Sequence, residues 1–212
     1  MSRYVSIAGP SALGLFVTAA SVCGAMLDGY SHREHPLALL GAAGVHGALL
    51  FNACAFVLPG ISVAVAVWMM RSAMPSAADL RARVGMQLMV LSALAFAAQG
   101  LLPLNADDLT GPANARHALA WTLWWIAFAA GGVLLAFGGL SQPFRRLSML
   151  SALVVLALAL PPWPGAMAAF APRLAYVGWF VWAAVAPRLI VGRDRNRLSH
   201  VSASSPESSR KE

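Results

Sequence analysis

The stretch from Gly44 to Met70, GVHGALLFNACAFVLPGISVAVAVWMM, decides the fold class, because its 27 residues include no Asp, Glu, Lys or Arg. A helix needs about 20 mostly apolar residues to cross the hydrocarbon core of a bilayer. The whole chain shares this character: 59% of its 212 residues are hydrophobic and 11% are charged. A soluble domain carries about 25% charged residues. We therefore predict an all-α, polytopic integral membrane protein.

Apolar stretches separated by short polar connectors predict six transmembrane helices in total. The expected spans are Val5–Leu27, Gly44–Met70, Val84–Leu104, Ala118–Leu140, Leu147–Leu160 and Leu174–Val191. The first span is treated as a helix rather than a cleaved signal peptide, because its apolar run exceeds the usual length of a signal-peptide core. Within the second span, Pro59-Gly60 predicts a kink. Residues 1–191 thus form the transmembrane domain, and the basic, Ser-rich residues 192–212 are expected to form a disordered cytoplasmic tail.

The basic residues predict the orientation of the bundle. With a cytoplasmic N-terminus, 12 of the 15 Lys and Arg residues fall on the cytoplasmic side, and Arg33, Arg116 and Arg173 fall outside. This bias follows the positive-inside rule, so both termini are predicted to be cytoplasmic. Abundant Ala, and Arg in place of Lys, indicate a bacterial origin and hence the inner membrane. Basic residues in connectors rather than on one helix face argue against nucleic-acid binding. Membrane lipids are the expected partners, with a second membrane protein as a further option.

Two outer loops hold most of the candidate chemistry. They are DGYSHREHP at 28–36 and NADDLTGPANARH at 105–117. Imidazole and carboxylate are common zinc ligands, so His32, His35 and Asp108 are metal-ligand candidates. A zinc-activated water beside Asp107 or Asp108 could attack an ester or a phosphate. The alternative is that solvated loops simply carry polar residues, and no second His-x-x-His pair completes a metal site. No cofactor is therefore expected, and a divalent metal is kept as the alternative.

His117 opens the fourth span and is followed by Trp121 one turn later. Two interpretations stay open: a titratable group beside an aromatic wall, or the edge of an interfacial aromatic belt. His117 and Asp107 are the candidate catalytic residues. Asn52, inside an apolar span, must find a hydrogen-bond partner within the protein, and contact with another helix is the default expectation. The candidate residues of an outward-facing pocket are His46, Asn52, Asn105, His117 and Trp121.

Three stretches resemble a prokaryotic membrane family known as domain of unknown function 998. They are YSHREHPLALLG at 30–41, LLFNACAFVLPG at 49–60, and GLLPLNADD at 100–108 with His117 downstream. The first stretch departs from the family's frequent serine-aspartate-leucine-glycine ending, because Ala38-Leu39-Leu40-Gly41 lacks the acid. The resemblance implies a six-helix membrane fold and brings no activity with it. The positions that match are Phe51, Asn52, Gly60, Pro103 and His117, with Asn105 or Asp107 at the acidic or amide position.

Two functions follow from these patterns. The first is a binding or accessory role with an outward-facing polar pocket for an unidentified small molecule or lipid. The alternative is an outer-leaflet lipid-modifying hydrolase, with or without a metal. The helix centres are apolar, which argues against transport of ions or sugars. The chain has no phosphate loop, Rossmann glycine pattern or His-Glu-x-x-His motif, so no reaction is assigned.

Overall fold

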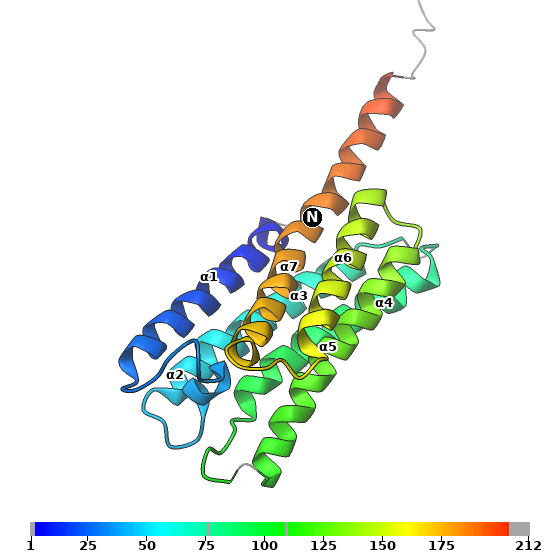
Figure 1. Cartoon of the computed structure of the whole chain (residues 1–212). Coiled ribbons are helices and arrows are strands. Elements are labelled where there is room, and N and C mark those ends of the chain that lie inside the picture. The colour runs from blue at the N-terminus through cyan, green and yellow to red at the C-terminus, as the bar shows by residue number, and fades with distance from the viewer. Residues whose placement is uncertain (1–2, 76, 109, 204–212) are drawn as a thin grey trace, which may run out of the picture.

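The protein is described by a computed structural model that covers residues 3–75, 77–108 and 110–203, with side chains as far as 190. Every regular element in these ranges is a helix. Six helical segments are long and apolar enough to cross a membrane, which confirms the predicted all-α, multi-pass architecture (Figure 1). The segments are α1 (Arg3–Met26), Ala48–Ser72, α4 (Leu80–Leu101), α5 (Pro112–Phe137), α6 (Gln142–Ala159) and Met167–Ile190 of α7 (Met167–Ala203).

The second span is a continuous helix with an irregular middle. It consists of α2 (Ala48–Asn52), the π-helical segment η2 (Ala53–Val57) and α3 (Leu58–Ser72). Pro59 has no N–H to donate, and its ring crowds the carbonyl one turn earlier. A π turn relieves this conflict by shifting the hydrogen bonds to a wider spacing. A π turn thus lies on the N-terminal side of Pro59-Gly60, where the sequence predicts a kink.

Three helices begin five or more residues earlier than the hydrophobic runs predict. α5 begins at Pro112 rather than Ala118, α6 at Gln142 rather than Leu147, and α7 at Met167 rather than Leu174. A proline in the first turn favours the start of α5 and of α6, because its missing N–H would be unpaired there in any case. α7 continues to Ala203 and so covers the first part of the predicted tail. Residues 204–212 lie outside the described residues.

The six spans form a closed ring. α1 packs against α3, α3 against α4, and α4 against α5. α5 packs against α6, α6 against α7, and α7 against α1. Glycines allow close approach at several of these contacts. A Cβ at Gly9 would lie 2.5 Å from the Ala183 carbonyl carbon, and one at Gly60 would lie 2.7 Å from the Ala97 nitrogen. These helices therefore meet backbone against backbone.

Aromatic side chains fill the centre of the ring. Phe96 is fully buried and contacts rings from α1, η2, α5 and α7. Its closest ring partner is Trp179, stacked with centroids 4.6 Å apart. Such pairs stabilise by about 0.5–1.5 kcal/mol each beyond the area they bury. The interior is therefore a packed aromatic core.

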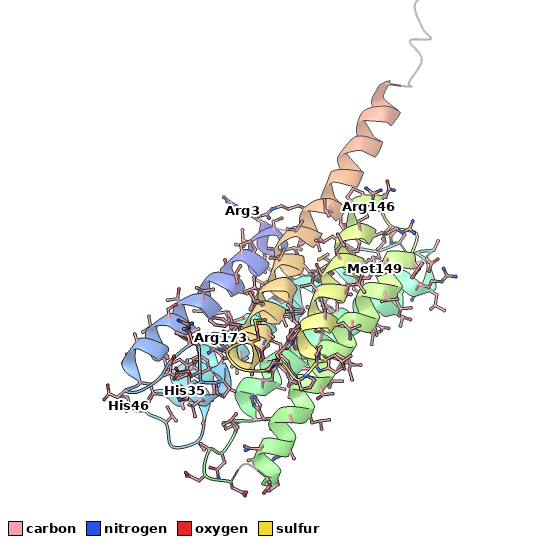
Figure 2. All side chains as sticks on the ribbon, viewed as in Figure 1. Arg3, His35, His46, Arg146, Met149 and Arg173 are labelled. Atoms are coloured by element: carbon pink, nitrogen blue, oxygen red, sulfur yellow. The ribbon has the colours of Figure 1, made fainter. Side chains whose placement is uncertain are left out.

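The bundle has two chemically different ends. We call the end formed by loops 27–47, 102–111 and 160–166 the histidine end, because His32, His35, His46 and His117 lie there. The opposite end is the arginine end. Its arginines with described side chains are Arg3, Arg71, Arg81, Arg83, Arg145, Arg146 and Arg188. Figure 2 shows His35, His46 and Arg173 towards one end, and Arg3 and Arg146 at the other.

Candidate functional site

The first loop of the histidine end forms a compact cluster around Tyr30. Gly29, with φ +73°, supplies the left-handed turn that follows α1. The backbone N–H of Ser31 donates to Nδ1 of His35 over 3.0 Å, which closes the loop on itself. The Tyr30 ring stacks on His35 with centroids 5.7 Å apart and meets the edge of His32 at 5.0 Å. Both histidines are therefore held against one phenol.

Arg173, in the second turn of α7, ties this cluster to the last helix. Its guanidinium donates to the Tyr30 hydroxyl over 2.7 Å and to the His35 carbonyl over 3.0 Å. A third bond reaches the Ala169 carbonyl within α7. All three acceptors are neutral, and the buried Nε has no partner in the described part of the chain. Arg173 is thus a half-buried cation, and no carboxylate among the described residues neutralises its charge.

Burial and the charge of Arg173 together shape the acid–base properties of the first loop. Burial raises the pKa of the Tyr30 hydroxyl, and the adjacent Arg173 charge and hydrogen bond oppose that rise. For His32, partial burial lowers the pKa of the imidazole, and the positive charge of Arg173 lowers it further. The loop therefore favours a protonated phenol and a neutral imidazole, which leaves Arg173 as the fixed charge of the cluster.

Asn52 anchors the second half of the first loop. Its side-chain amide donates to the Gly41 carbonyl over 2.8 Å, and both residues are buried. Gly41 ends the short 3₁₀ helix η1 (Leu37–Gly41), and a Cβ there would collide with the Asn52 amide. Two residues on, the Ala43 N–H donates to the Leu104 carbonyl over 2.8 Å. The partner of Asn52 is therefore loop backbone rather than the neighbouring helix expected from sequence.

The second loop is organised by a pair of asparagines. The Asn114 side chain accepts from the Asn105 N–H over 2.6 Å and donates to the Asn105 carbonyl over 3.0 Å. The Asn105 side chain in turn accepts from the Asp107 N–H. Asp107 and Asp108 themselves are exposed to solvent. Asn105 thus shapes the loop, and the two carboxylates face outward from it.

His117 is half-buried in the second turn of α5, where its Nδ1 lies 2.8 Å from the Leu102 carbonyl. One turn deeper, Trp121 meets the Tyr176 ring at 5.3 Å. The Tyr176 hydroxyl donates to the side-chain oxygen of Gln99, and both residues are buried. The contact between His117 and the Leu102 carbonyl therefore joins the C-terminal end of α4 to α5, at the edge of the aromatic core.

The predicted site residues are brought together only in part. His32 and His35 share the Tyr30 cluster, but Asp108 belongs to the other loop. His46 is exposed, whereas Asn52 is buried, so they do not share a surface. No hydrogen bond joins Asp107 to His117 in the described structure, and each is engaged with a different part of the loop. Within the described ranges, no three His, Cys, Asp or Glu side chains group closely enough to hold a metal ion.

Sequence reasoning missed the central role of Arg173, which entered only a count of charges. The available signal was its position, a solitary cation at the edge of an apolar span.

No protein-family model matches the chain, and neither a curated protein nor a solved structure matches it. The functional argument below is therefore built on the contacts of this chain alone.

Proposed function

We propose that this protein is a binding or accessory protein of the bacterial inner membrane that holds a small anionic group at Arg173. In the proposed orientation the histidine end faces outward and both termini are cytoplasmic. The excess of arginine at the opposite end supports this orientation. The three motif stretches quoted above support a relationship to domain of unknown function 998, which we include in the proposal.

The observation that carries the proposal is the uncompensated guanidinium of Arg173. A buried or half-buried cation normally has a carboxylate partner that offsets its charge. Among the described residues, Arg173 has three neutral acceptors and one buried nitrogen without a partner. Its loop partners, Tyr30 and His35, hold the group in place through a hydroxyl and a backbone carbonyl. A phosphate or carboxylate, free or on a lipid headgroup, would supply the missing negative charge.

The hydrolase alternative has less support from the geometry. It requires His117 and an acid within hydrogen-bond reach of one reacting group. His117 is engaged by the Leu102 carbonyl, and the side chain of Asp107 is exposed. A binding role needs only the Arg173 cluster and is therefore the function we propose.

The test compares Arg173→Gln with Arg33→Gln, a matched loss of one positive charge from an exposed arginine in the first loop, next to the Tyr30 cluster. Binding is measured calorimetrically in neutral detergent with inorganic phosphate, and in phosphatidylcholine nanodiscs with and without added phosphatidylglycerol. A hydrogen bond to a charged group contributes about 1.5–3 kcal/mol. We therefore expect Arg173→Gln to weaken binding by about 10–100-fold and Arg33→Gln to have little effect. The two ligands distinguish a free anion from a lipid headgroup.

A second variant separates binding from folding. Tyr30→Phe removes one bond between the loop and Arg173 but leaves the guanidinium in place. We expect it to bind within about threefold of the unmodified protein, because the charge-assisted contact is retained. Equal losses in Tyr30→Phe and Arg173→Gln would mean that loop structure, not the charge, governs binding. That result, or no binding of either ligand, would refute the proposal.

The orientation has its own test. Two reporters are fused after Lys211, one that works only in the cytoplasm and one that works only in the periplasm. We expect activity from the cytoplasmic reporter and none from the periplasmic reporter. The opposite pattern would reverse the proposed sidedness and place the Arg173 cluster inside the cell.

A further inference from the structure

A groove at the arginine end lies outside the candidate site described above. It has a volume of about 310 Å³ and opens between the end of α5 and the start of α6. Its lining residues are Ala136, Phe137, Gln142, Arg145, Arg146 and Met149. Figure 2 shows Arg146 and Met149 on α6, away from the end that carries His35 and His46. Arginines and apolar side chains thus share one small surface.

The groove is built around the C-terminus of α5. The last carbonyls of a helix have no partner within the helix and carry partial negative charge. The Arg145 Nε donates to the Ala136 carbonyl, and an Arg81 nitrogen lies 3.4 Å from the Phe137 carbonyl. Arginines from α6 and α4 therefore converge on the same helix end. Each is attached through one nitrogen, which leaves the other nitrogens of its guanidinium for a ligand.

The charge around the groove is almost entirely positive. Arg146 is exposed and makes no hydrogen bond within the described part of the chain. Asp79 is the one acidic residue of this end whose side chain is described, and its carboxylate accepts from the Arg81 N–H. Asp79 lines a separate cavity of about 630 Å³ between the α3–α4 loop and α7, not this groove. A negatively charged ligand would therefore meet Arg145 and Arg146 without a facing carboxylate from the part of the chain whose side chains are described.

The apolar wall of the groove distinguishes a lipid from a free anion. Phe137 is 56% exposed and ends α5, and Met149 lies two turns into α6. Both side chains are on spans, so acyl chains are the solvent expected beside them. We propose that this groove binds an anionic phospholipid, with the phosphate on Arg145 and Arg146 and an acyl chain against Phe137 and Met149. Basic pockets between membrane helices are a known means of holding anionic headgroups.

The test is lipid binding by native mass spectrometry of the full chain released from maltoside micelles. The probes are dioleoylphosphatidylglycerol, dioleoylphosphatidylcholine and water-soluble glycerol phosphate. The variant is Arg146→Gln. The control is Arg83→Gln, which removes an exposed arginine from the same end without touching the groove. Neither side chain has a hydrogen-bond partner within the described structure, so both variants are expected to fold.

We expect tighter binding of phosphatidylglycerol than of phosphatidylcholine, and negligible binding of glycerol phosphate. Arg146→Gln should weaken phosphatidylglycerol binding about fivefold, the factor that one arginine contributes near an anionic surface. Arg83→Gln should leave it unchanged. Equal binding of the two lipids, or equal losses in the two variants, would overturn the proposal. The Arg173 cluster lies at the other end of the bundle. A failed test of anion binding at Arg173 would therefore leave the lipid-binding result unaffected.

Discussion

Replacing Asn52 by Ala should destabilise the bundle through a single lost contact. The Asn52 amide donates to the Gly41 carbonyl, and Asn52 is only 8% exposed. A buried acceptor left without a donor costs about 1–3 kcal/mol. Hydrogen bonds between membrane helices average about 0.6 kcal/mol and reach about 1.7 kcal/mol. The burial of both groups places this contact at the upper end, so we expect a loss of about 1.5 kcal/mol, roughly tenfold in the unfolding equilibrium.

The assay is reversible unfolding by sodium dodecyl sulfate in mixed micelles, followed by tryptophan fluorescence. Asn114→Ala is the matched control. Asn114 makes three hydrogen bonds to the 105–108 loop, but it lies half-buried in the first turn of α5, where water can replace them. We expect the control to lose less free energy of unfolding than Asn52→Ala, although it loses more hydrogen bonds. The reverse order, or a change below about 0.3 kcal/mol for Asn52→Ala, would refute the argument from burial.

A second substitution at the same position tests the role of the donor. Asn52→Asp keeps the shape, but an ionised carboxylate would face the Gly41 carbonyl oxygen. The protonated carboxyl can donate as Asn52 does, so the variant should be less destabilised in acid, where the carboxyl is protonated, than at neutral pH. A variant whose deficit does not change with pH would mean that no donor is needed there.

Three further predictions follow from contacts described above. Gly9→Ala should cost about 1–3 kcal/mol in the same unfolding assay, because the new Cβ would meet the Ala183 backbone, whereas Gly14→Ala has open space and should be neutral or stabilising. Because the pKa of His32 is lowered in the folded protein, the unfolded chain binds more protons, so stability should fall slightly as the pH drops below about 6.5. His32→Gln should flatten this slope and His46→Gln should leave it in place; a slope unchanged in His32→Gln would contradict the assignment. Chelation with EDTA should leave the thermal midpoint unchanged, and a fall in that midpoint would indicate a structural metal.

The number and class of the spans follow from the sequence because lipid imposes a simple rule on every crossing segment. The length of the run from Gly44 to Met70 and its lack of charged residues were enough to predict a transmembrane helix. The starts of α5 and α6 were placed too late, since polar residues in the first turns are helical but do not raise hydropathy. Pro112 and Pro143 were the usable signals, because proline favours the first turn of a helix.

The contacts of the candidate site were less predictable. Asn52 was correctly expected to need a partner inside the protein, but the partner, Gly41, is backbone and carries no side-chain signal. Arg173 and Tyr30 are 143 residues apart, and nothing local to either one indicates the other. Pairings of this kind arise from closure of the helix ring, in which α7 packs beside α1. Spacing along the chain predicts which residues share a helix, but not which helices become neighbours.

The bond between Arg173 and Tyr30 also sets an order of events during synthesis. Ribosomes add about 5–20 residues per second, so the 143 residues that separate the partners take roughly 7–30 s to make. During that interval the first loop has been synthesised, but Arg173, which donates a hydrogen bond to Tyr30 in that loop, has not. The loop's mature conformation must wait until the last membrane segment has been inserted, so a nascent chain truncated before Arg173 should leave this loop open to proteases that the finished protein resists.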